Sequence, residues 1–120
     1  MNALAPKIRE TDIKRAIVQF LRLRGFRCWV RNVGGAYGLQ FVRFAEPGQS
    51  DIWGYEVGTA RHIEVEVKRK GARTDSKRAA LQKAWLEQCR RDGVIAFQAA
   101  SVEEVEARLV EYGYARRLLV

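Results

Sequence analysis

The stretch GQSDIWGYEVGTARHIEVEVKRK, residues 48–70, decides the fold that the sequence predicts. Apolar and polar residues alternate in it on both sides of a Gly58-Thr59 pair, and alternation with a period of two is typical of β-strands. We therefore expect two antiparallel strands, at residues 51–55 and 61–69. A two-residue type II′ turn at Gly58-Thr59 would connect them, and a four-residue loop centred on the same point would give the same strand register.

In that register two acidic residues face each other. Asp51 lies opposite Glu66, with Cβ atoms about 5 Å apart, and Lys68 projects on the same side of the second strand. Opposed carboxylates repel each other unless a cation lies between them, and oxygen ligands are those that Mg²⁺ or Mn²⁺ accepts. With a lysine beside the ion, this arrangement predicts metal-assisted hydrolysis of a phosphodiester. The alternative is a solvated strand face, on which glutamate and lysine pair while Val65 and Val67 are buried.

Hydrophobic periodicity, caps and glycine stops predict the remaining elements. They are helices at residues 6–25, 74–93 and 101–113, and strands at residues 26–32, 39–44 and 94–99. The order αββββαβα predicts one α/β domain, residues 1–120, in which a mixed, mostly antiparallel sheet is flanked by helices. In the second helix Leu81, Trp85 and Cys89 form the stripe expected to face the sheet, and all three tryptophans of the chain are expected in the core.

The chain carries a formal net charge of +8, and the excess is shared between its two halves. The charge is densest directly after the second strand of the hairpin, where only Asp75 interrupts a series of cations. The series comprises Lys68, Arg69, Lys70, Arg73, Lys77, Arg78 and Lys83. Such a cluster favours a polyphosphate partner over a merely solvated face, because neutralising phosphates releases condensed counterions.

Other classes of protein are disfavoured. No apolar run is long enough for a transmembrane helix, and the start of the chain lacks the apolar segment of a secretory signal. Cys28 and Cys89 form no CxxC pair and the chain has a single histidine, so neither a zinc site nor a disulfide framework is expected. We expect a cytoplasmic protein without membrane association.

Motifs from the first expected helix through the second resemble those of the PD-(D/E)xK nucleases, and specifically the stand-alone VRR-NUC proteins of bacteria and phages. The matching residues are Glu10 ahead of Ile13, Arg31 to Gly35, Asp51 at the end of GQSD, Glu66 to Lys68 as EVK, and Gln82 to Leu86 as Q..WL. The chain departs from the family at Ser50, where the relatives have a proline before the aspartate; a proline stiffens the backbone and is not a ligand. The resemblance implies a restriction-endonuclease-like core.

Carried over residue by residue, the resemblance also implies a metal site and a catalytic lysine. The Mg²⁺ or Mn²⁺ ligands would be Asp51, Glu66, the carbonyl of Val67, and Glu10 acting directly or through water. Lys68 would be the catalytic lysine, and Gln82 would close the site from the second helix. Without the resemblance, Glu10 is equally well explained as an acid that favours a helix dipole, and Gln82 as a boundary glutamine.

The run of basic residues leaves the second strand of the hairpin and enters the next helix, which puts it beside the proposed metal site, where the DNA backbone is expected to lie. The residues expected to contact this backbone are Arg69, Lys70, Arg73, Lys77 and Arg78, with Arg31 beside the glycine-rich turn. No role is assigned to Glu64.

The resemblance implies a metal-dependent DNA endonuclease that acts as a homodimer on branched DNA such as four-way junctions, in a bacterial or phage-infected cell. The alternative is a catalytically inactive nucleic-acid-binding module with the same fold, against which the intact Asp51, Glu66 and Lys68 argue. An unrelated α/β protein with a chance ExK motif would gain no stability from divalent metal. The sequence leaves open the preferred DNA structure, the number of ions and the dimer surface.

Overall fold

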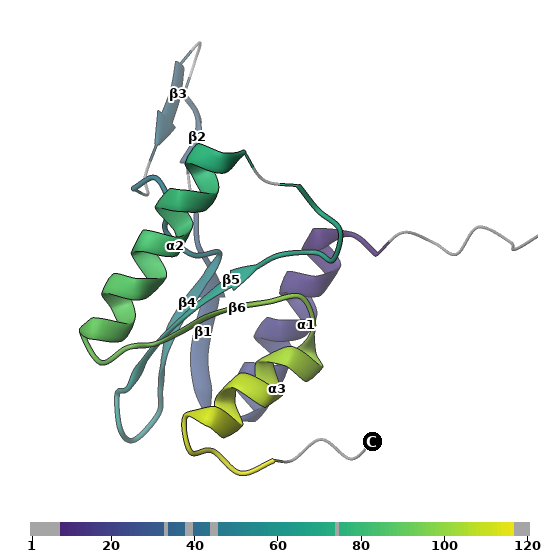
Figure 1. Cartoon of the computed structure of the whole chain (residues 1–120), viewed down its shortest axis with the longest axis vertical. Helices are drawn as coiled ribbons and strands as arrows, with labels where there is room; N and C mark the ends of the chain where they lie inside the picture. The colour runs from purple at the N-terminus through teal and green to yellow at the C-terminus, as the bar shows by residue number, and fades with distance from the viewer. Residues whose placement is uncertain (1–7, 33, 38–39, 44–45, 74, 117–120) are drawn as a thin grey trace, which may run out of the picture.

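The computed structural model describes residues 8–32, 34–37, 40–43, 46–73 and 75–116. Its elements are α1 (Glu10–Leu23), β1 (Phe26–Val30), β2 (Gly34–Tyr37), β3 (Gln40–Arg43), β4 (Ile52–Glu56), β5 (His62–Val67), α2 (Ser76–Arg91), β6 (Ile95–Ala99) and α3 (Val102–Glu111). The main sheet has the strand order β1-β4-β5-β6, in which β5 and β6 run parallel and the other neighbours antiparallel. Helix α2 lies on one side of this sheet, and α1 and α3 lie on the other (Figure 1).

The β4–β5 hairpin has the expected register. Trp53 lies opposite Glu64 and Tyr55 opposite His62, and the backbone N–H of Glu56 extends the ladder with a 2.8 Å hydrogen bond to the Arg61 carbonyl. The connection is the four-residue loop 57–60, so the two-residue type II′ turn was wrong. In this loop Gly58 and Ala60 have positive φ, 95° and 59°. A type II′ turn at Gly58-Thr59 would need a positive φ at Gly58 alone.

The segment between β1 and β4 differs from the sequence prediction. Residues 34–37, expected in a glycine-rich connection, form the additional strand β2, which pairs antiparallel with β3 in a separate two-stranded sheet. Because the ladder begins with Gly34 opposite Arg43, the glycines take part in strand pairing. Strand β1 pairs with β4 in the main sheet. The element order is αβββββαβα, with one strand more than expected.

The main core lies between the sheet and the α1–α3 layer. The side chains of Ile63, Val65 and Val67 on β5 are fully or almost fully buried there, against Ile17 of α1 and Leu109 of α3. Each fully buried aliphatic side chain contributes about 1.5–3 kcal/mol to folding. The opposite sheet face has a smaller apolar cluster, formed by α2 with β6. Strand β5 is therefore covered on both sides, and its glutamates Glu64 and Glu66 are buried almost as deeply as its valines, while His62 at its start is exposed.

The helix ends show which sequence signals were read correctly. Asp75 caps α2 by accepting a 3.3 Å hydrogen bond from the Arg78 backbone N–H, and Ser101 caps α3 by accepting one of 3.2 Å from Glu104. Helix α1 begins at Glu10 after Arg9, without a side-chain cap. The expected helix start at residue 6 lies outside the described residues. No helix in the described part of the chain has the length and apolar character needed to cross a membrane.

The buried stripe of α2 is rotated by one residue from the predicted one. The helix buries Gln82, Leu86 and Cys89, while the Leu81 side chain is exposed. Leu81 lies against the loop before β4, where a Cβ at position 48 would lie 2.7 Å from the Leu81 carbonyl oxygen, and Gln82 donates a hydrogen bond to Glu66 of β5.

Candidate active site

Asp51 and Glu66 converge where β4 begins and β5 ends. Hydrogen bonds hold both the backbone and the side chain of Asp51. Its carbonyl oxygen accepts one from the Arg31 backbone N–H (2.6 Å), and its Oδ2 accepts one from the Val67 backbone N–H (2.8 Å). Glu66, in the penultimate position of β5, is only 4% exposed. The solvated strand face left open by the sequence is therefore wrong for this strand.

The Glu66 carboxylate has one partner for its two oxygens. Oε2 accepts a 2.9 Å hydrogen bond from the Gln82 side-chain amide, while Oε1 is buried and has no hydrogen-bond partner among the described residues. Burial, followed by the charge of Asp51 and a contact with its carboxylate, raises the pKa of Glu66 to about 8; the cations Arg78 and Lys14 act in the opposite direction. The fold thus holds two carboxylates close together, and the cations near them offset their repulsion only in part.

Lys14 is a site residue that the sequence did not reveal. Its ammonium lies 3.3 Å from Asp51 Oδ1 and 3.9 Å from Glu10 Oε1. In the sequence, Glu10 and Lys14 have the spacing of an ordinary surface pair on a helix, and only the packing of α1 beside the start of β4 brings the lysine to the acid. The Glu10 side chain is half exposed, and among the described residues no group of three acidic, histidine or cysteine side chains is placed to hold a metal ion.

A cavity of about 170 Å³ brings several predicted site residues together. Its walls include Glu10, Glu66, Val67, Lys68, Arg69, Arg73, Arg78 and Gln82. Asp51 lines the adjoining hollow, which shares Arg78 and Gln82 with the cavity. Of the other three predicted DNA contacts, Lys70 and Lys77 are exposed, and neither they nor Arg31 line the cavity.

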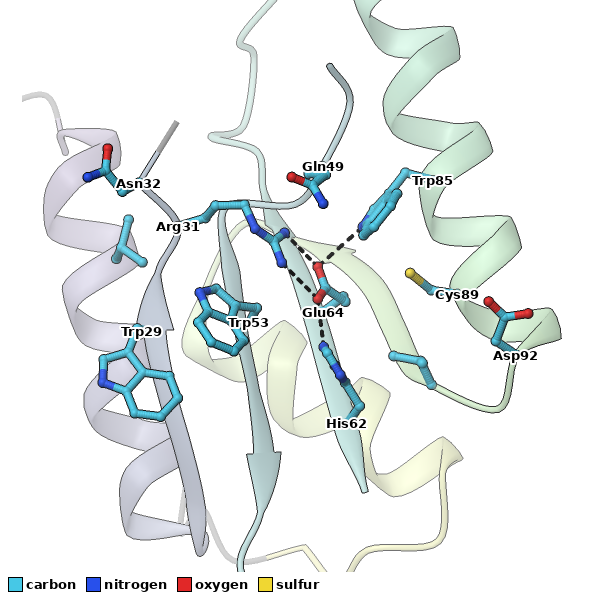
Figure 2. Close-up of a pocket in the computed structure, with 12 residues that line it drawn as sticks. Trp29, Arg31, Asn32, Gln49, Trp53, His62, Glu64, Trp85, Cys89 and Asp92 are labelled. Carbon is cyan, nitrogen blue, oxygen red and sulfur yellow. Dashed lines mark hydrogen bonds and ion pairs between the residues drawn. The ribbon is translucent and has the colours of Figure 1, made fainter. Parts of the chain in front are cut away.

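Glu64, two residues before Glu66, is buried in a complete network of partners (Figure 2). Arg31 binds its carboxylate with both terminal nitrogens at 2.8 and 3.0 Å, and His62 contacts it at 2.7 Å. Hydrogen bonds from the Ser50 hydroxyl (2.9 Å) and the Trp85 indole (3.2 Å) complete the set. Burial disfavours the charged form of Glu64, but Arg31, His62 and Ser50 together hold the pKa of this carboxyl below its usual range.

This network explains two positions read differently in the sequence. The Arg31 guanidinium, expected to contact DNA phosphate, is engaged by Glu64 and by the Ser50 carbonyl at 2.9 Å, so the structure gives it a positioning role. Ser50, at the position where the family has a proline, connects Glu64 to Trp85 through its hydroxyl. Together these contacts hold the residue before Asp51 against β5 and α2.

The donor set fits a hard divalent cation. Two carboxylates, one of them carrying a buried oxygen without a partner, offer the oxygen ligands that Mg²⁺ and Mn²⁺ bind, and a bound ion would offset the repulsion that raises the pKa of Glu66. Asp51 and Glu66 are the side chains that would hold it, with Val67 on the cavity wall beside them.

The comparisons with known proteins give a structural match. No model of a known protein family matches the sequence, and no curated protein matches it. A solved structure described as a VRR_NUC domain superposes with a TM-score of 0.57 at 19% sequence identity, covering 88% of this chain and 97% of the other. The chain therefore has the fold of a VRR_NUC domain, as the resemblance implied.

Proposed function

We propose that the protein is a metal-dependent DNA endonuclease that hydrolyses phosphodiester bonds. The observation that carries this proposal is the buried Glu66 oxygen without a partner, in a carboxylate pair with Asp51 next to Lys68. A buried charge left uncompensated costs stability, and such groups occur preferentially where a ligand or a reaction needs them. The fold match to a VRR_NUC domain supports the same assignment.

In this proposal the residues of the site have separate tasks. Asp51 and Glu66 hold Mg²⁺ or Mn²⁺, which would supply Lewis-acid stabilisation of phosphate charge and a more acidic water. The Val67 N–H and the Gln82 amide fix the two carboxylates in place. Lys68, on the cavity wall beside Glu66, orients the attacking water or stabilises charge on the phosphate. Glu10, also on the cavity wall, is a further acid that would reach the ion directly or through water.

The DNA backbone is proposed to lie over the cationic surface next to the cavity. Arg69, Arg73 and Arg78 line the cavity, and Lys70 and Lys77 extend the positive surface beyond it. We further propose branched DNA, such as a four-way junction, as the substrate and a homodimer as the active form, in the cytoplasm of a bacterial or phage-infected cell. One site per chain is sufficient for one strand, and a two-fold substrate is cut on two strands by a two-fold pair of sites.

The test is cleavage of labelled four-way junction, duplex and single-stranded DNA with Mg²⁺, with Mn²⁺ and with EDTA. Asp51→Asn and Lys68→Ala should reduce cleavage by at least about 10²-fold while DNA binding is retained. Glu103→Gln, an exposed acid in the first turn of α3 that lines neither the cavity nor the adjoining hollow, is the matched control and should cut normally. Sedimentation of the protein with junction DNA tests the homodimer.

Each negative outcome has a distinct meaning. Wild-type protein that binds the junction without cutting it, with either metal, would favour the inactive binding module. Absence of any stabilisation by Mg²⁺ or Mn²⁺ in thermal unfolding would refute the metal site itself.

A further inference from the structure

Two tryptophans expected in the core lie on the surface of the sheet. Trp29 is 41% and Trp53 36% exposed, and they face each other across the β1–β4 pair with ring centroids 5.1 Å apart. Tyr55, also exposed, lies 6.4 Å from the Trp29 ring. The expectation failed because α2 packs on β5 and β6 and leaves the same face of β1 and β4 uncovered. The result is a platform of neighbouring aromatic rings.

This platform forms one wall of a pocket of about 730 Å³ (Figure 2). Trp85 and Cys89 of α2 line the opposite side, and the buried pair of Arg31 and Glu64 lies between the two walls. The Arg31 guanidinium lies 5.9 Å from the Trp53 ring and 5.8 Å from the Trp85 ring. The pocket therefore presents flat rings and a cation held between them, and it has the size of sites that accept planar organic groups.

A second groove, of about 510 Å³, adjoins the aromatic pocket and shares Trp29 and Val30 with it. Its other walls carry the cations Lys14, Arg15 and Arg22 of α1, and none of the acidic residues in the described part of the chain lines it. Lys14 at one end contacts Asp51. The groove thus runs from the candidate active site to the aromatic pocket, and its positive charge suits a phosphate backbone.

We propose that the aromatic pocket binds unpaired bases of single-stranded DNA whose phosphates follow the cationic groove. A positively charged groove beside stacking aromatic rings is the arrangement by which proteins bind single strands without reading their sequence. The inference rests on the proposed nuclease function and, within branched DNA, favours substrates that carry a single-stranded segment next to the scissile phosphate over a fully paired four-way junction. A double helix keeps its bases stacked on each other and cannot offer them to Trp29 and Trp53.

Charge favours DNA over a second copy of the chain as the occupant. A two-fold pair meeting on the aromatic platform would bring two copies of the Lys14, Arg15 and Arg22 groove together, with no acid in the groove to offset them. Of the acids in the aromatic pocket, Glu64 is paired with Arg31, and Asp92 accepts a hydrogen bond from Gln88 at the far end of α2.

The test measures binding in EDTA, without cleavage. Tryptophan emission should be quenched by short oligo-dT, and Trp53→Ala and Trp29→Ala should each weaken oligo-dT binding about 5- to 150-fold, the range for loss of one stacked base. Trp53→Phe should restore most of the affinity, duplex binding should stay within about twofold, and a strand of abasic sites should not distinguish Trp53→Ala from wild type. Thermal unfolding midpoints establish that each variant is folded.

Several results would overturn the inference. Oligo-dT affinity unchanged in both alanine variants, or an equal loss on duplex DNA, would show that the rings do not stack on bases. Tryptophan emission could instead depend on protein concentration and not on DNA. If the alanine variants then sediment as monomers and the wild type as a dimer, the platform is the interface with a second copy of the chain. Base stacking is measured in EDTA and cleavage is measured with metal, so the two proposals can fail separately. If only the nuclease proposal fails, the protein will bind oligo-dT through its tryptophans but will not cut DNA.

Discussion

Replacing Glu66 by glutamine should stabilise the metal-free protein at high pH. The pKa of Glu66 is raised from 4.5 to about 8 by burial and by Asp51. Between these values the folded protein retains a proton that the unfolded chain has lost, so the free energy of unfolding falls as pH rises through this window. The slope approaches about 1.4 kcal/mol per pH unit, and the loss between pH 5 and pH 9 amounts to about 4 kcal/mol.

Glu66→Gln removes the titrating group and keeps the shape. A side-chain amide oxygen can still accept the hydrogen bond from Gln82, and the repulsion from Asp51 disappears. The variant should therefore be close to wild type at pH 5 and about 4 kcal/mol more stable at pH 9. Mg²⁺ should recover much of this difference in the wild type at pH 8–9, by binding the folded state, and should do little for the variant.

The assay is urea unfolding followed by circular dichroism at several pH values, in EDTA and in Mg²⁺. The difference between wild type and Glu66→Gln isolates this group from the other titrating residues, and Glu103→Gln is the control for loss of an exposed acid. A difference that does not change between pH 5 and pH 9 would refute the reasoning. So would equal stabilisation of both proteins by Mg²⁺.

Three further substitutions test other parts of the structure. Arg31→Ala leaves the buried Glu64 carboxylate without its main partner and should cost about 3–5 kcal/mol in urea unfolding, much of it recovered by adding Glu64→Gln. Gly48→Ala should destabilise more than Gly58→Ala, by about 1–3 kcal/mol, because both glycines have positive φ but only the Cβ at 48 meets a neighbour. Lys14→Met removes a cation from the metal site and should lower the Mg²⁺ concentration needed for thermal stabilisation by about tenfold; an unchanged midpoint would show that this lysine does not compete with the ion.

Local sequence pattern was sufficient for the hairpin and insufficient for the helix that covers it. The alternation in residues 51–67 puts the valines on one face, and a turn centred on Gly58-Thr59 sets the register, so Asp51 and Glu66 could be paired from sequence. In α2, by contrast, Leu81 and Gln82 are both reasonable choices for the buried stripe. In the structure Leu81 lies against Gly48, more than 30 residues away, and Gln82 donates a hydrogen bond to Glu66, and a helical period does not contain these tertiary contacts.

Polar pairs between residues far apart in the chain could not be predicted from the sequence for the same reason. Arg31 and Glu64 are 33 residues apart, and each reads as a surface charge until β1 and β5 lie on either side of β4. Lys14 reads as the partner of Glu10 on its own helix until α1 is packed beside Asp51. The exposed tryptophans are the converse case, because the face that they occupy becomes a surface only through the position of α2.

Glu64 and Glu66 together give the strongest physical argument for a ligand at the second position. They lie on the same face of the same strand and are nearly equally buried, at 2% and 4% exposure. The fold surrounds Glu64 with Arg31, His62, Ser50 and Trp85, and its pKa is lowered. Two residues further along, Glu66 accepts one hydrogen bond from the Gln82 amide, and burial and Asp51 raise its pKa to about 8 against the weaker effect of Arg78 and Lys14. A sequence able to neutralise one buried carboxylate so thoroughly could do so for the next, and the missing countercharge is most simply supplied by a cation that arrives from solution.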